Sequence, residues 1–368
     1  MIEPQKKQRL EWLDAMRGFT MILVVANHVG AMAFEIPRGV STSLQFLVLF
    51  RMPLFFFVSG FLAYKASQVW NLATFGQLVG KKLRVQIIPT VAFFLLAAMM
   101  LTKDLWTTIP DWLHRPTKGG YWFTIVLLYM FLVYYVFAYL ESKLTSHLSP
   151  LTSKKVSWIP ITLLFIVSLV FYESCYLPQH FSWAFGWRGR PNEFMNYSSL
   201  TLLFQYFPFF IYGNIVHRYW EQAQKLMDSR WFCPVIVVVV IFAAMDTLKW
   251  HTLRMAWAIL PLTLARFILL TMVVMYFRHY QQYFTQHSVM GASLQYIGRR
   301  TLDIYLIHYL FLPDLPTIGA FFDKYRHNFV LDTLTTVITA LLVIAFCIIT
   351  SNILRVSPFF RKWLFGRS

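Results

Sequence analysis

Charged residues are scarce in this chain. Asp, Glu, Lys and Arg make up 13% of its 368 residues, whereas an average soluble domain carries roughly 25%. A soluble protein of this length could not cover its surface with so few charges. Hydrophobic residues account for 58% of the chain, which excludes disordered and collagen-like chains. The composition therefore favours a polytopic membrane protein.

Cysteine is also rare, and none of the three residues, Cys175, Cys233 and Cys347, forms a CxxC pair with another. This excludes a disulfide scaffold, and we expect neither a metal site nor a redox site. The chain has no internal repeat, low-complexity tract or soluble domain. We therefore predict a single membrane-embedded domain over residues 1–368.

Long apolar runs are abundant. A membrane-spanning helix needs about 20 mostly apolar residues, and each run is continuously apolar, unlike the alternating strands of a barrel. The sequence predicts an all-α, polytopic bundle of about ten transmembrane helices. The candidate runs are 15–33, 44–64, 85–101, 120–140, 156–173, 199–217, 231–247, 255–276, 301–321 and 329–354.

Basic residues exceed acidic ones by 33 to 16, for a net charge of +17. They lie mainly between the apolar runs, so we read them as determinants of orientation and expect no nucleic-acid partner. With the N-terminus inside, 20 basic residues fall in cytoplasmic segments, 10 in outer loops and 3 within spans. The cytoplasmic segments are 1–14, 65–84, 141–155, 218–230, 278–300 and 355–368. This bias predicts a cell (inner) membrane protein with both termini cytoplasmic.

The first apolar run contains ionisable groups, which are costly inside a bilayer and usually mark a path or a site. Arg17 and His28 are eleven residues apart, so they share one helix face about 16 Å apart along the axis. Asp14 lies one turn before Arg17 and can hold its guanidinium. The alternative is an interfacial Arg and an ordinary hydrogen-bonded His.

Two further groups of basic residues fit the same path. Arg51, in the second run, is expected at a depth close to His28, although its long side chain can also reach outward to water. Lys81, Lys82 and Arg84 precede the third run. They fit an ordinary positive-inside cluster or, together with Arg17, a small basic site for a polyphosphate.

Several motifs, in order along nearly the whole chain, resemble those of the acyltransferase 3 family of membrane acyltransferases. The family's first-helix pattern, R-x10-H, matches Arg17 and His28. Lys81-x-x-Arg84 occupies the place of its cytoplasmic R-x-x-R, with Lys in place of the first Arg. The remaining matches are Met52–Phe61, Tyr121-Trp122-Phe123 and Gly298-x-x-Thr301-x-x-x-Tyr305-Leu306-Ile307-His308.

The resemblance implies transfer of an acyl group, most often acetyl, from cytoplasmic acyl-CoA to a hydroxyl of a surface glycan, lipid or small molecule. Acyl-CoA is then the donor substrate, and no bound cofactor is expected. Arg17, Lys81, Lys82 and Arg84 would hold the head of coenzyme A. His28 would act as general base or as transient acyl carrier, with Asp14 orienting Arg17.

Other polar residues are weaker candidates. Asn27 and Ser59 could hydrogen-bond the thioester oxygen, and Arg51, Trp122 and His308 are expected to line the cavity. The carboxylate that orients His28 stays open among Glu35, Glu173, Asp246 and Asp303. In the outer loop 174–198, the aromatic and basic residues fit a glycan acceptor or an interfacial belt; they are Trp183, Phe185, Trp187, Arg188 and Arg190.

Two other functions remain open at this point. A transporter or flippase for a glycolipid or small solute could use the same intramembrane Arg and His, although no repeat of paired broken helices supports it. A structural membrane subunit would leave Arg17, His28 and Arg51 unexplained. The sequence does not indicate the acceptor or the oligomeric state.

Overall fold

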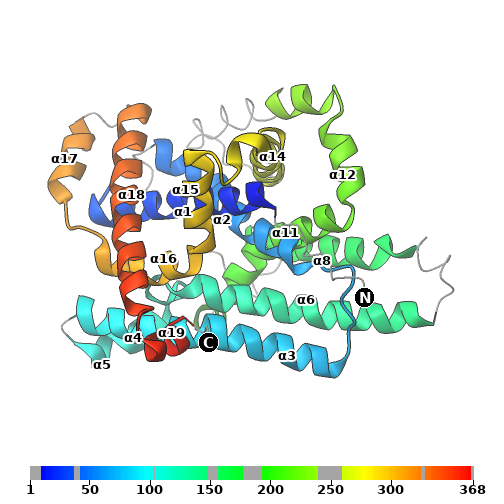
Figure 1. Ribbon diagram of the computed structural model, residues 1–368, viewed down its shortest axis with the longest axis horizontal. Helices are drawn as coiled ribbons and strands as arrows, with labels where there is room; N and C mark the ends of the chain where they lie inside the picture. The colour runs from blue at the N-terminus through cyan, green and yellow to red at the C-terminus, as the bar shows by residue number, and fades with distance from the viewer. Residues whose placement is uncertain are drawn as a thin grey trace.

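The computed structural model describes residues 10–36, 42–102, 104–147, 156–176, 193–238, 259–324 and 328–365. Within these ranges the regular elements are all helices, so the predicted all-α class is confirmed there. The longer helices are α1 (Glu11–His28), α2 (Thr42–Ala63), α3 (Leu72–Lys82), α4 (Ile88–Leu101), α6 (Trp122–Ser146), α8 (Trp158–Tyr176), α11 (Leu200–Arg218), α14 (Ile259–His279), α15 (Val289–Arg299) and α18 (Phe329–Leu354) (Figure 1). The shorter ones are α5 (Leu105–His114), α10 (Glu193–Ser198), α12 (Trp220–Met227), α16 (Thr301–Ile307), α17 (Pro316–Lys324) and α19 (Pro358–Trp363).

Four of the described helical segments are long and apolar enough to cross a membrane. They are Glu11–Ala33, Leu72–Leu101, Trp122–Ser146 and Phe329–Leu354. In Figure 1, α18 crosses the direction of α3 and α6, so the described helices are not one set of parallel spans. The count of about ten spans is therefore not confirmed. Part of the predicted run 231–247 lies outside the described residues.

The predicted span 301–321 is wrong as a single helix. Helix α16 ends at Ile307, a 3-10 turn covers His308–Phe311, and α17 begins only at Pro316. Pro313 and Pro316 explain the break, because proline lacks the amide that a helix interior needs and pushes the preceding residue toward an extended conformation. Leu312, before Pro313, is indeed extended, with φ −65° and ψ 120°.

The third predicted span begins earlier than expected. Helix α3 starts at Leu72, inside the segment predicted as a cytoplasmic loop, and continues through a π-helical turn at Leu83–Ile87 into α4. A second π-helical turn, Val29–Ala33, directly follows His28. Such turns are rare and occur often at functional sites. Here each begins directly after a candidate site residue, Lys82 or His28.

Helix α1 lies at the centre of the described fold and is buried along most of its length, against α2, α14, α15, α16 and α18. Glycine allows its closest contact. A Cβ on Gly18 would lie 2.0 Å from the Leu294 carbonyl oxygen, and one on Gly298 would lie 1.9 Å from that of Asp14. The backbones of α1 and α15 therefore touch, which places the start of α16 beside Arg17.

Candidate active site

A cavity of about 360 Å³ opens between α1, α2, α3, α6 and α16. Ligand pockets in proteins have volumes of roughly 300–1,000 Å³. Aromatic side chains make up much of the wall, and polar side chains lie among them. The aromatic residues are Phe55, Trp70, Phe123, Phe131, Tyr135 and Tyr305, and the uncharged polar residues include Ser59, Gln68, Gln86, Thr124 and Thr301.

Four cationic side chains line this cavity: Arg17, Lys65, Lys81 and Lys82. No Asp or Glu is among the described residues that line it. Lys65 and Lys81 are exposed, and the Lys82 ammonium lies 3.3 Å from the centre of the Phe131 ring. An excess of positive charge in a hollow with aromatic walls suits an anionic ligand that also carries a flat or apolar part.

Arg84 does not belong to this cluster. It is exposed and is not a lining residue, and it lies in the π-helical turn Leu83–Ile87 that follows Lys82. Arg84 lies outside this cavity, and its expected part in holding the donor head stays a prediction. Lys65 lines the cavity instead, in a loop where the sequence offered no periodic signal.

Arg17 connects α1 to α16. Its Nη1 lies 3.4 Å from Asp14 Oδ1 in an ion pair, and its Nη2 donates to Thr301 Oγ1 at 3.0 Å. Asp14 is buried and does not line the cavity, so the ion pair holds the Arg17 guanidinium at the cavity wall from the protein side. Thr301 is the Thr of the sequence motif Gly298-x-x-Thr301, and its contact is the Arg17 guanidinium.

His28 lies farther along the same helix and contacts His308. The two nitrogens His28 Nδ1 and His308 Nε2 are 2.8 Å apart, and the ring planes differ by 9°. His28 is partly exposed, whereas His308 is wholly buried. Because Thr301 meets Arg17 and His308 meets His28, α16 runs alongside α1 in the same direction.

Two more candidates lie near this pair and not at the cavity. Arg51, on α2, interacts electrostatically with both His28 and Tyr309, which agrees with its expected depth. Asn27 is buried on α1 beside His28. Neither is among the residues that line the cavity, and neither is His308.

Ser59 and Trp122 have other surroundings than the sequence suggested. Ser59 lines the cavity, but its hydroxyl donates to the backbone oxygen of Phe55 at 3.0 Å. Trp122 does not line the cavity and stacks on Tyr206, with ring centres 5.5 Å apart. Its neighbour Phe123 occupies the wall instead.

Tyr305 lies between the cavity and the histidine pair. It lines the cavity, and its ring centre is 6.1 Å from that of His308. Its hydroxyl donates to the Gly120 oxygen at 2.7 Å and accepts from the Phe123 amide at 3.1 Å. These bonds tie α16 to the start of α6, so the weak motifs at Tyr121-Trp122-Phe123 and Tyr305 meet in space.

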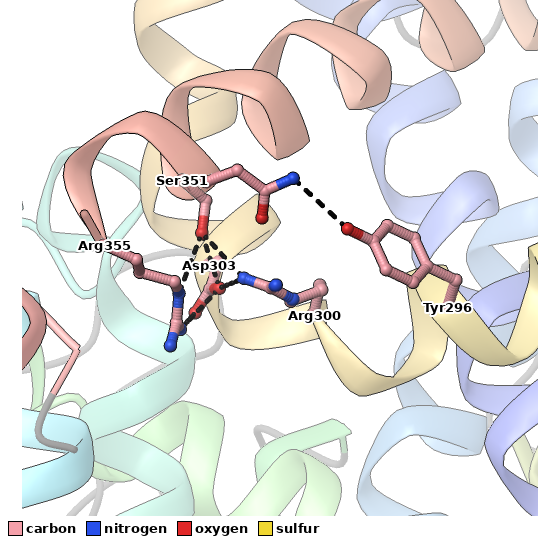
Figure 2. Close-up of polar contacts among 6 residues, drawn as sticks. Tyr296, Arg300, Asp303, Ser351 and Arg355 are labelled. Atoms are coloured by element: carbon pink, nitrogen blue, oxygen red, sulfur yellow. Dashed lines mark hydrogen bonds and ion pairs between the residues drawn. The ribbon is translucent and has the colours of Figure 1, made fainter. Parts of the chain in front are cut away.

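The other side of α16 is held by an ionic cluster (Figure 2). Asp303 accepts from Arg355 at 2.9 and 2.7 Å and from Ser351 at 2.8 Å, and Arg300 lies 3.3 Å away. Asp303 is thus engaged with α18. We expect the cluster to fix helix α16, which carries Thr301 and Tyr305 and leads directly into His308.

No carboxylate contact to His28 is found among the described residues. Asp303 serves the ionic cluster, Glu173 accepts from Thr263 at 2.9 Å, and Glu35 is exposed. Asp246 lies outside the described residues, as do Trp183, Phe185, Trp187, Arg188 and Arg190 of the outer loop. The ring nitrogen of His28 for which the sequence analysis expected a carboxylate partner contacts His308 instead.

The fold and site define a helical membrane protein with a cationic cavity beside its central helix α1 and a histidine pair between the end of α1 and the end of α16. Residues 10–352 match the model of the acyltransferase domain family also called acyltransferase 3. The chain belongs to this family of membrane acyltransferases, as the sequence resemblance indicated. Separate comparisons with curated proteins and with solved structures gave no match.

Proposed function

We propose that the chain is an integral membrane O-acyltransferase that moves an acyl group, in the first instance acetyl, from cytoplasmic acyl-CoA to a hydroxyl of a cell-surface glycan or glycolipid. The observation that carries the proposal is the cavity lined by Arg17, Lys65, Lys81 and Lys82 without an acidic lining residue among those described. Coenzyme A pairs a polyphosphate head with a long thin arm, so it suits a cationic cavity with apolar walls.

The second support is the position of His28 relative to this cavity. Arg17 lies at the cavity, and His28 lies eleven residues farther along α1, about 16 Å away. A head held by the cations would let the extended arm reach toward the histidine pair past Tyr305. His28 would then take the proton of the acceptor hydroxyl as it attacks the thioester carbonyl. A transient acyl group on His28 is the alternative route.

The test is acyl transfer from radiolabelled acetyl-CoA into the glycan and lipid fractions of membranes that contain the chain. We expect His28→Ala to lower incorporation at least about 100-fold, since a positioned general base contributes about 10²–10⁴-fold. The matched control is His279→Ala, which removes an exposed histidine at the end of α14 and should keep full incorporation.

Equal labelling by the His28→Ala variant would remove His28 from the chemistry. Absence of label from every membrane, together with movement of a glycolipid across vesicles without acyl-CoA, would favour the transporter alternative. The acyltransferase is supported if the unaltered chain and the His279→Ala control both label lipid or glycan while His28→Ala does not. The labelled fraction then identifies the acceptor.

A further inference from the structure

We propose that His308 is a positioning residue that holds the ring proton of His28 on Nδ1, so that His28 Nε2 is the atom that accepts the hydroxyl proton. The inference rests on the proposed function for its consequence in catalysis. The hydrogen-bond pattern itself does not depend on that function, so it can be tested separately.

The argument starts at the far side of His308. Its Nδ1 lies 2.8 Å from the backbone oxygen of Tyr305 and 3.1 Å from that of Ile304. Helix α16 ends at Ile307, and the carbonyl groups of a final helical turn are open to donors other than helical amides. Because a carbonyl oxygen can only accept, Nδ1 of His308 must carry the hydrogen.

The same ring then has an acceptor on its other side. His308 is wholly buried, and a buried imidazolium without a carboxylate partner is costly. No carboxylate contact to His308 is found among the described residues. In a neutral ring with hydrogen on Nδ1, Nε2 has a free lone pair. That lone pair faces His28 Nδ1 at 2.8 Å.

The consequence for His28 follows directly. Its Nδ1 must donate to His308, so in the neutral ring its Nε2 is the unprotonated nitrogen. His28 is partly exposed as a residue, whereas His308 is wholly buried. The arrangement therefore leaves one defined basic atom on the histidine that a substrate can approach.

In the reaction, the acceptor O–H bond breaks and its proton moves to His28 Nε2. The freed oxygen attacks the thioester carbonyl carbon, the C–S bond breaks, and the thiolate of coenzyme A leaves with the electron pair. The proton on Nε2 then passes to that thiolate. While His28 is charged, its Nδ1–H still donates to His308. The role resembles that of the carboxylate in a Ser-His-Asp triad, which fixes the tautomer of its histidine, but here a neutral ring backed by backbone carbonyls does so.

The first experiment compares two substitutions of His308 in the full-length protein. His308→Phe keeps a flat ring and removes the acceptor, whereas His308→Gln retains a side-chain oxygen that can accept from His28. We expect His308→Phe to lower kcat about 100-fold or more and to change KM for acetyl-CoA less than about 3-fold, because His308 does not line the cavity. His308→Gln should recover at least about 10-fold of the lost kcat.

The matched control is His217→Phe on α11. His217 Nδ1 also contacts a backbone oxygen, that of Phe61 at 2.5 Å, and its ring stacks on Phe61. It does not line the cavity. A kcat loss confined to the His308 variants and relieved by Gln supports the proposal. A kcat for His308→Phe equal to that of the unaltered chain, or no recovery with Gln, overturns it.

The second experiment does not use activity. Nitrogen-15 NMR of the histidine-labelled protein in lipid distinguishes the two neutral tautomers, and the His28 signal is identified by its loss in His28→Ala. We expect the Nδ1–H form in the unaltered chain and a mixture or the Nε2–H form in His308→Phe. An Nε2–H His28 in the unaltered chain overturns the proposal whatever the activity. The expected tautomer in a chain without acyl transfer would instead show that the proposed function fails while the pairing holds.

Discussion

Two groups of basic residues lie on either side of the start of α16, and they differ in what neutralises them. Arg300 and Arg355 share the carboxylate of buried Asp303, with Ser351 filling the remaining bonds. Lys65, Lys81 and Lys82 surround a cavity for which the described residues supply no acidic wall. The first group is complete within the protein, and the second has positive charge available for a ligand.

This difference separates stabilising from binding roles among residues that look alike in the sequence. A cation whose hydrogen bonds are satisfied by a buried carboxylate contributes to the fold, and its removal leaves the partner uncompensated. An exposed cation at a cavity has little to lose in folding and more to gain from an anionic ligand. Arg17 combines the two roles, because it pairs with the carboxylate of Asp14 and also lines the cavity.

The largest effect on stability is expected from Asp303→Asn. The substitution keeps the shape of the buried Asp303 side chain but leaves Arg300 and Arg355, which are partly exposed, without the carboxylate that they share. We expect a loss of about 3–5 kcal/mol in the free energy of unfolding, the usual result of removing one partner of a buried pair. The measurement is the unfolding of the purified protein in detergent, by melting temperature and by denaturant.

Asp111→Asn provides the matched comparison for Asp303→Asn. Asp111 also pairs with an arginine, Arg115 at 2.9 Å, but both side chains are about half exposed or more. We expect little change in stability from this variant. Equal losses for the two variants would mean that burial of the ionic cluster does not distinguish it.

The opposite pattern is expected at the cavity. Lys65→Gln combined with Lys81→Gln removes two exposed cations, so the melting temperature should stay unchanged. KM for acetyl-CoA should rise about 10-fold or more, as expected for loss of charged contacts to phosphate. The steady-state kinetics of the double variant and of Lys362→Gln, an exposed lysine on α19, give the comparison.

A double variant with unchanged KM and unchanged salt dependence would contradict a donor site in this cavity. A double variant that lost stability without a change in KM would show that these lysines stabilise the fold, as the ionic cluster does, and do not bind the donor. Because Lys362 lies outside the cavity, its substitution measures how much of any effect comes from net charge alone.

The sequence was most informative within single helices. The 3.6-residue period placed Arg17 and His28 on one face of α1, and charge counts drew attention to Lys81 and Lys82, which line the cavity beside Arg17. The same counting also included Arg84, which does not line the cavity, because a charge count ignores where a residue points around the helix.

Contacts between distant segments could not be read from the sequence. His308 meets His28 across 280 residues, and this contact depends on the close approach of Gly18 and Gly298 and on the end of α16 before Pro313. The continuous apolar run 301–321 concealed that break. Lys65 lies in a loop, where neither periodicity nor spacing predicts which cavity a side chain will reach.

The smallest effect is expected at Asp228, in the loop after α12. Arg278 donates to both carboxylate oxygens at 2.8 and 2.7 Å, and this hydrogen bonding lowers the pKa of Asp228 below its ordinary value. Because the folded-state pKa is lowered, ionised Asp228 stabilises the fold at pH values above the ordinary carboxyl pKa of about 3.9. This stabilisation is lost as the pH falls below that value and the carboxylate becomes protonated. However, the Asp228 side chain is 62% exposed, so water already solvates the charge.

We expect Asp228→Asn to lower the melting temperature by less than about 2 °C near pH 7 and by still less near pH 3. Melting curves at the two pH values test this sign, and a loss at pH 7 as large as that of Asp303→Asn would show that geometry, and not burial, decides what an ion pair contributes in this protein.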